Sequence, residues 1–235
     1  MQKIIPAILP MSYRAIELGV EKVHDITKTV QIDFVDGSFA PNRTWIFNNK
    51  DGNIVSEILS QDRGLPFWEE VNYELDLMVA NPLQYMETFI ALGPSKIIFH
   101  IEGLDVEKVI TYIEELPEII KDSISFGIAI GIETDPESIR PLLPYIASIQ
   151  CMGILRVGFQ AQTFDTRVLD QIKKVHALYP EKIIAVDGGV NKENISALAL
   201  AGANEFVVGS AVFQSPDIYG TIDTLRRLCN TKSTT

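Results

Sequence analysis

Acidic and amide side chains occur near the ends of three predicted strands, where they could act together on one substrate. Gln31 and Asp33 occupy alternate positions of one strand, so their side chains point to the same face. Asp76 lies in the next strand, and Asp187 ends a later one. Three carboxylates in close contact are costly unless a cation neutralises them or one of them holds a proton. We favour a cation, although any single aspartate could instead cap a helix or pair with a lysine or arginine.

The ligand set Gln31, Asp33, Asp76 and Asp187 would offer only oxygen atoms to that cation. Carboxylate and amide oxygens suit Mg²⁺ or Mn²⁺ better than Zn²⁺. The sequence therefore predicts a divalent metal site of the magnesium or manganese type, whose binding could also be weak or absent.

Histidine and cysteine contribute less to the predicted chemistry. His24 and His176 fall in predicted helices, where a solvated position is usual, and for His100 we favour a structural role over a catalytic one. Cys151 has no base partner in the sequence, and with Cys229 it predicts buried thiols rather than a disulfide or a metal site.

Eight short apolar runs alternate with eight longer amphipathic stretches, a pattern typical of a parallel sheet covered by helices. The predicted strands are 3–9, 29–35, 73–79, 96–101, 125–131, 148–156, 182–187 and 205–209. The predicted helices are 13–26, 52–61, 82–92, 105–120, 136–146, 165–178, 191–202 and 217–229. Eight such units in a chain of 235 residues predict a single-domain α/β fold, a (β/α)₈ TIM barrel over residues 1–231, with a short tail at 232–235.

Glycines follow the last two predicted strands, in Asp187-Gly188-Gly189 and in Gly209-Ser210. Glycine lets backbone N–H groups approach an anion, and a phosphate site after the seventh and eighth strands recurs in this type of barrel. Each motif alone is weak because glycine is common in turns, but together they predict phosphate binding. The segment from Arg156 to Phe164 could close over the same phosphate or be an ordinary connection, and the long connection 36–52 is predicted to cover the substrate.

The formal net charge is −11, from 20 Lys+Arg against 31 Asp+Glu, which argues against a nucleic-acid partner. The sequence contains no apolar run of membrane-spanning length and does not begin with a signal peptide, so we expect no membrane partner and a cytoplasmic location. Any phosphate would be held largely by backbone N–H groups rather than by basic side chains.

The residues just described, in this order, resemble the ribulose-phosphate 3-epimerase family over nearly the whole chain. The resemblance is carried by Pro6-Ala7-Ile8-Leu9, 32–42 (IDFVDGSFAPN), Asp76-Leu77-Met78-Val79 with Asn81-Pro82, Phe99-His100-Ile101-Glu102, Gly158-Phe159 with Gln162 and Phe164, Val186-Asp187-Gly188-Gly189, and 207–213 (VVGSAVF). It implies a (β/α)₈ barrel of the ribulose-phosphate-binding type, an isomerase of the pentose phosphate pathway, and a homo-oligomer.

The resemblance implies that Asp33 and Asp187 are catalytic. One aspartate removes the C3 proton of a ketose phosphate, such as D-ribulose 5-phosphate, and the other returns a proton to the opposite face of an enediolate that a divalent metal stabilises. The implied contacts with the sugar phosphate are Ala7, Met78, Gly158, Gln162, Gly188, Gly189, Gly209 and Ser210.

The sequence also departs from the family pattern. Gln31 and Asp76 replace the two metal-binding histidines, Ala7 replaces a serine, and the loop 157–161 has lost two of its usual glycines. Two interpretations follow: an epimerase with altered ligands, or a paralogue that binds a sugar phosphate with changed or lost catalysis. A sugar-phosphate decarboxylase is less consistent, because Asp33-Phe34-Val35-Asp36 lacks the lysine those enzymes place between two aspartates. A non-enzymatic phosphate-binding protein is the remaining class. We favour the epimerase.

Overall fold

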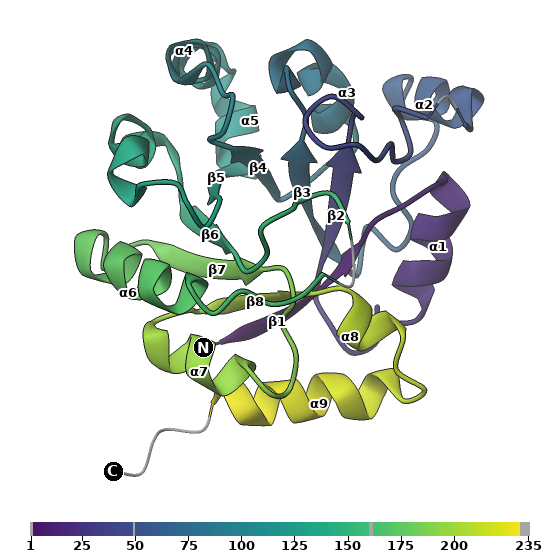
Figure 1. Ribbon diagram of the computed structural model, residues 1–235. Coiled ribbons are helices and arrows are strands. Elements are labelled where there is room, and N and C mark those ends of the chain that lie inside the picture. Colours follow the sequence, from purple (N-terminus) through teal and green to yellow (C-terminus); the bar gives the residue numbers. More distant parts are fainter. Residues whose placement is uncertain (1, 49, 160–161, 231–235) are drawn as a thin grey trace.

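The computed structural model describes residues 2–48, 50–159 and 162–230. Eight parallel strands close into one barrel in sequence order, with the helices outside it (Figure 1). The strands are β1 (Lys3–Ile8), β2 (Thr29–Val35), β3 (Asn72–Met78), β4 (Lys96–His100), β5 (Ser125–Ile130), β6 (Ser148–Met152), β7 (Ile183–Asp187) and β8 (Glu205–Val208). The predicted TIM barrel is confirmed. Among the described helices, none is both long and apolar enough to cross a membrane. The tail predicted at 232–235 lies outside the described residues.

The helices are α1 (Tyr13–Glu21), α2 (Gly52–Leu59), α3 (Met86–Ala91), α4 (Val106–Glu115), α5 (Glu118–Ser123), α6 (Val168–Leu178), α7 (Ile195–Ala201), α8 (Ser210–Phe213) and α9 (Ile218–Cys229). Two 3₁₀ helices, η1 (Pro82–Tyr85) and η2 (Pro136–Tyr145), complete the set. Figure 1 shows α9 lying along the outside of the barrel, where it contacts β1.

Three predicted elements are wrong in extent or type. The helix expected at 105–120 is two helices, because the residue before Pro117 takes an extended conformation and ends α4. The segment 136–146 is a 3₁₀ helix, in which Pro141 and Pro144 have no N–H to donate. The strand expected at 148–156 ends at Met152, where Gly153 N turns to donate to Asp187 O at 2.6 Å.

Alternation along each strand separates an outer apolar layer from a partly polar interior. Val30, Ile32 and Phe34 of β2 belong to the main core cluster between sheet and helices, and so do the odd-numbered residues of β3 and β4. The even-numbered residues of β3 and the remaining positions of β2 face the barrel interior instead. The side chains that could do chemistry are therefore carried on the inner face of the sheet.

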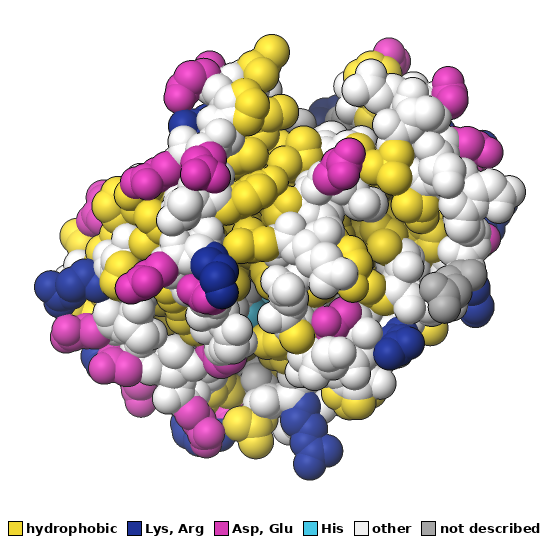
Figure 2. Space-filling model, turned by 90° about the horizontal axis from the view of Figure 1, so that it is seen from above, with side chains coloured by type: hydrophobic (Ala, Val, Ile, Leu, Met, Phe, Trp, Pro, Cys, Tyr) yellow, Lys and Arg dark blue, Asp and Glu magenta, His cyan; other side chains and the backbone are white. Residues whose placement is uncertain are grey.

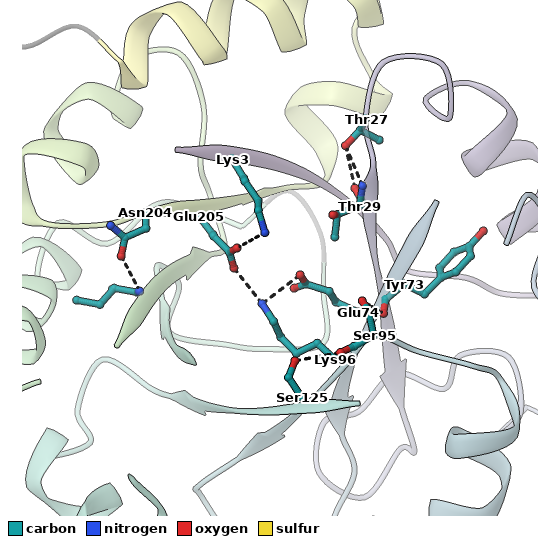
Figure 3. Close-up of polar contacts among 11 residues, drawn as sticks. Lys3, Thr27, Thr29, Tyr73, Glu74, Ser95, Lys96, Ser125, Asn204 and Glu205 are labelled. Carbon is teal, nitrogen blue, oxygen red and sulfur yellow. Dashed lines mark hydrogen bonds and ion pairs between the residues drawn. The ribbon is translucent and has the colours of Figure 1, made fainter. Parts of the chain in front are cut away.

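Charged side chains cross the barrel interior near the amino-terminal ends of the strands (Figure 3). Glu205 of β8 accepts from Lys3 at 2.8 Å and from Lys96 at 2.9 Å, and Lys96 lies 3.1 Å from Glu74. Because β4 and β8 are on opposite sides of the closed barrel, the Lys96–Glu205 pair spans its interior. Glu74 is two residues before Asp76 on β3, so this ion cluster lies one layer beneath the acidic side chains predicted to be functional.

Figure 2 views the molecule from above, relative to Figure 1. Acidic and basic side chains are interspersed around the edge of this face, and hydrophobic side chains gather between them. No continuous basic surface is visible in this view, in keeping with the net charge of −11.

Candidate active site

The carboxylates predicted from sequence converge inside the barrel. Asp33 of β2 and Asp76 of β3 are register partners on adjacent strands, and Asp187 is the last residue of β7. One oxygen from each of these three carboxylates lies within 4.8 Å of the others. Asp33 and Asp76 are buried, whereas Asp187 is partly exposed. Strand alternation brings the three acids together, as the sequence analysis expected.

Amide groups bridge the three acids. Gln31 Nε2 donates to Asp33 Oδ1 at 2.9 Å and to Asp187 Oδ2 at 3.0 Å. Gln150 Nε2, from β6, lies 3.3 Å from Asp76 Oδ2 and 3.4 Å from Asp187 Oδ2. Each amide nitrogen carries two hydrogens, so each can serve two carboxylates. The acidic cluster is thus tied together by N–H donors from side chains of β2 and β6.

His100 completes the contacts around Asp76. Its Nε2 lies 2.9 Å from Asp76 Oδ1, and the ring of Phe39 lies 5.1 Å from the imidazole, centroid to centroid. Burial opposes charging of the imidazole, but the Asp76 carboxylate outweighs burial and raises the pKa of His100. His100 is therefore directly bonded to the acidic cluster.

Burial and mutual repulsion set the proton affinity of the two outer acids. Burial, followed by the carboxylates of Asp187 and Asp76, raises the pKa of Asp33 well above its usual value. Burial, followed by the Asp76 carboxylate, raises the pKa of Asp187 to about 7, against the opposing effects of Gln31 and His100. Carboxyl groups with such raised pKa values can exchange protons near neutral pH.

A cavity of about 530 Å³ opens over Asp33 and Asp187. All eight residues predicted to contact the substrate line it: Ala7, Met78, Gly158, Gln162, Gly188, Gly189, Gly209 and Ser210. Apolar side chains of Met152, Ile154 and Val207 complete much of its wall. Gln31 and Asp76 are not part of the lining and lie behind the two acids that are, so the cavity presents a pair of carboxylates at one end.

Glycines form the opposite end of this cavity. Gly189 has a φ of 69°, and a Cβ there would lie 2.9 Å from Phe164 Cα, so only glycine fits without a shift. The side-chain amides of Asn191 and Asn194 both donate to Gly189 O, at 3.1 and 3.0 Å. These bonds fix the turn after β7 beside Ser210, which begins α8. The turn is held in place and leaves no side chain between its backbone and the cavity.

The segment after β2 folds over the mouth of the barrel. Asp36 accepts from the backbone N–H groups of Ser38 at 2.7 Å, Phe39 at 2.8 Å and Ala80 at 2.9 Å. Asn42 Nδ2 donates to Gly158 O at 3.4 Å, linking this segment to the loop after β6. Phe164 of that loop packs against Gly189, while residues 160 and 161, where the family glycines were expected, lie outside the described residues.

Sequence reasoning missed Gln150 and understated His100. The alternation Ser148, Gln150, Met152 on a predicted strand was the available signal for an inward amide. His24 was placed in a helix, but α1 ends at Glu21, and His24 lies in the following turn, 3.0 Å from Glu70 and stacked on Phe67.

The two cysteines are buried and free, as expected. Burial raises the pKa of Cys151 to about 12, so its thiol is inert at neutral pH. Cys151 belongs to the core cluster between the sheet and the helices rather than to the barrel interior.

The fold and the acidic cavity define a sugar-phosphate type of TIM-barrel enzyme, and comparison with known proteins identifies the family. The ribulose-phosphate 3 epimerase family profile matches residues 3–213, and the chain belongs to this family. It is 31% identical to ribulose-phosphate 3-epimerase of Helicobacter pylori strain J99 over 220 residues, covering 92% of each chain. It is 29% identical to the Bacillus subtilis enzyme over 238 residues, covering 96% of this chain and 99% of the relative. Family membership supports an epimerase-like function.

Solved structures share the barrel at low sequence identity. The 3-hexulose-6-phosphate synthase of Salmonella typhimurium superposes with a TM-score of 0.66 at 16% identity, covering 97% of this chain and 98% of that one. KGPDC from Streptococcus mutans, solved in complex with ribose 5-phosphate, superposes with a TM-score of 0.70 at 9% identity, covering 97% of both chains. These likenesses concern the fold.

Proposed function

We propose that this protein epimerises a ketose phosphate at C3, interconverting D-ribulose 5-phosphate and D-xylulose 5-phosphate or a closely related pair. The observation that carries the proposal is the cavity that joins the carboxylates of Asp33 and Asp187 to the glycine turns after β7 and β8. Membership of the ribulose-phosphate 3 epimerase family supports it. The pentose phosphate pathway and the cytoplasm are the expected setting, and a homo-oligomer is the expected assembly.

Asp33 and Asp187 act as the two bases. One carboxylate removes the C3 proton, which is acidified by the neighbouring carbonyl, and the other carboxyl returns a proton to the opposite face of the enediolate. Raised pKa values suit both roles, since a group that titrates near neutral pH can accept and donate protons during turnover. Gln31 holds both carboxylates through one amide nitrogen, which fixes their separation.

The residues present fit the divalent cation on which the family generally depends. Three carboxylates within 4.8 Å form a hard, all-oxygen donor set, and Gln31 Oε1 is buried without a partner among the described residues. Turning the Gln31 amide by 180° would give that oxygen a cation partner. Asp33, Asp76, Asp187 and Gln31 would hold Mg²⁺ or Mn²⁺ in preference to Zn²⁺. When bound, the ion supplies electrostatic stabilisation of the enediolate oxygens.

The phosphate group binds at the glycine end of the cavity. Gly188, Gly189, Gly209 and Ser210 line it, so backbone N–H groups are the available donors for an anion there. Ala7 and Met78 contact the sugar, and Gly158 and Gln162 close the side nearest the loop after β6. A protein of the same fold that was solved in complex with ribose 5-phosphate is consistent with this class of ligand.

The second candidate is a paralogue that binds a sugar phosphate but has changed or lost catalysis. It is favoured by the replacement of both expected metal-binding histidines, by Gln31 and Asp76. The two candidates share the cavity and the phosphate end, so only a measurement of chemistry separates them.

The test is solvent proton exchange. The purified protein is incubated in D₂O with D-ribulose 5-phosphate, with and without Mg²⁺, Mn²⁺ or Zn²⁺, while the C3 position is followed by NMR. The proposal predicts deuterium at C3 and formation of the epimer, strongest with Mg²⁺ or Mn²⁺. Absence of exchange with every metal, for this substrate and related ketose phosphates, would leave the paralogue as the better account.

A further inference from the structure

A buried glutamine that has no part in the proposed proton transfers lies against the acidic cluster. Gln150 is in the middle of β6, where it pairs with Ala129 of β5 and Ala185 of β7, and it is 1% exposed. The nearby interior residues Ile98, Ala129 and Met152 form an apolar cluster. An amide buried in such surroundings is unfavourable unless it finds polar partners.

The partners of Gln150 are two carboxylates of the site. Its Nε2 lies 3.3 Å from Asp76 Oδ2 and 3.4 Å from Asp187 Oδ2, so one N–H can point to each acid. Asp76 and Asp187 repel each other when both are charged. A donor placed between them offsets this repulsion and holds the two oxygens at a fixed separation.

The other half of the amide shows what its orientation serves. Oε1 of Gln150 is buried and has no hydrogen-bond partner among the described residues. Turning the amide by 180° would place that oxygen against both carboxylates and remove both N–H contacts. The observed orientation therefore satisfies the acids at the expense of a buried acceptor, and an unsatisfied buried group of this kind calls for a specific explanation.

We propose that Gln150 is a positioning residue for Asp187. By holding Oδ2, it fixes the rotation of the carboxylate that faces the cavity, and its second N–H ties that carboxylate to Asp76, which His100 in turn anchors at 2.9 Å. This assignment rests on the proposed function, in which Asp187 exchanges a proton with C3. Gln150 acts on one of the two bases, because its hydrogen bonds reach Asp187 and not Asp33.

That asymmetry provides a test which a purely structural role would not pass. The substrates are D-ribulose 5-phosphate and D-xylulose 5-phosphate, each deuterated at C3, and the measurement is the initial rate at which each epimer loses its label. The Asp33→Asn variant first identifies the epimer that Asp187 serves. In Gln150→Leu, loss from that epimer slows about 10- to 100-fold, while loss from the other epimer changes less than about threefold. Equal slowing of both epimers, or no slowing, contradicts the proposal.

Gln171 provides a matched control. It is also a buried glutamine with an unpaired Oε1 among the described residues, but its Nε2 donates to the backbone oxygens of Gly131 at 2.6 Å and Thr134 at 3.3 Å. Gln171→Leu should lower stability without changing the ratio of the two exchange rates. A shift of that ratio as large as in Gln150→Leu would show that the effect is general to lost buried amides, and would overturn the inference.

A crystallographic comparison separates this inference from the proposed function. If the wild-type enzyme removes label from neither epimer, the proposed function fails, and crystal structures of the wild type and Gln150→Leu then decide the positioning alone. We expect one Asp187 orientation, bonded to Gln150, in the wild type and a rotated or doubled orientation in the variant. The same single orientation of Asp187 in both structures would overturn the inference.

Discussion

His100 Nε2 lies 2.9 Å from Asp76 Oδ1, and the two side chains are 2% and 0% exposed. The histidine occupies the last position of β4, and the acid lies on the adjacent strand β3. Asp76 is thus held from one side by an imidazole and from the other by the amide of Gln150. A carboxylate with two such partners can stay charged at the base of the cavity, which a bare buried acid could not.

Removal of the imidazole should therefore destabilise the fold. His100→Leu leaves Asp76 without its cationic partner, and we expect a loss of about 3 kcal/mol in the free energy of unfolding. Urea denaturation at neutral pH gives the value. In the double variant with Asp76→Leu, the buried charge is gone as well, so part of the loss should return. A single variant as stable as the wild type would mean that the pair contributes nothing.

Replacement of Asp76 should change the preference for metals. Asp76→His substitutes an imidazole for a carboxylate, and we expect Zn²⁺ affinity to rise about tenfold, or about 1.4 kcal/mol, while Mn²⁺ affinity falls. Isothermal titration calorimetry with each ion measures both changes. Unchanged affinity for both ions would show that residue 76 does not contribute to a metal site.

Stability without added divalent ions should fall as the pH rises toward neutrality. The pKa of Asp187 is raised to about 7 in the folded protein, from a usual value of 3.8. Between those pH values the folded chain keeps a proton that the unfolded chain releases, so the unfolded state gains relative stability as pH increases. We expect a loss of about 1 to 2 kcal/mol between about pH 5.5 and 7. Urea midpoints should show it, and Asp187→Asn should flatten the profile; a wild-type profile that rises over this interval would be contrary evidence.

The ion cluster beneath the active site should be a major contributor to stability (Figure 3). Lys96 is the buried cation that bridges Glu74 and Glu205, whereas the side chain of Lys3, which also contacts Glu205, is 55% exposed. Lys96→Met takes a partner from two buried carboxylates, and we expect a cost of about 3 to 5 kcal/mol. Lys108→Met, which breaks the exposed pair with Asp105, is the control and should leave the denaturation midpoint almost unchanged. Equal midpoints for the two variants would contradict this role.

Much of this architecture could be predicted from sequence because strand periodicity is local. The alternation in β2 alone places Gln31 and Asp33 on one face, and eight repeated units predict closure of the sheet. The cavity likewise unites the glycines after β7 and β8 with Ala7 at the end of β1, as their positions on the strands predicted.

The remaining parts depend on contacts across the barrel. Glu205 meets Lys96 from the opposite side of the closed sheet, at a sequence separation of 109 residues, which no local pattern indicates. Gln150 and His100 were likewise missed or undervalued because their roles come from Asp76, which is 74 and 24 residues away. The helix expected at 105–120 was wrong for a local reason that was visible, Pro117.

The central claim is that Asp33 and Asp187 act on opposite faces of C3, and single-epimer exchange tests it most directly. Asp33→Asn and Asp187→Asn are each given C3-deuterated D-ribulose 5-phosphate and D-xylulose 5-phosphate, and loss of label is followed by NMR. We predict that both variants lose epimerisation by at least about 10²-fold, and that each still exchanges one epimer, a different one for each variant. Full epimerisation by either variant, or exchange of the same epimer by both, would contradict the two-base account.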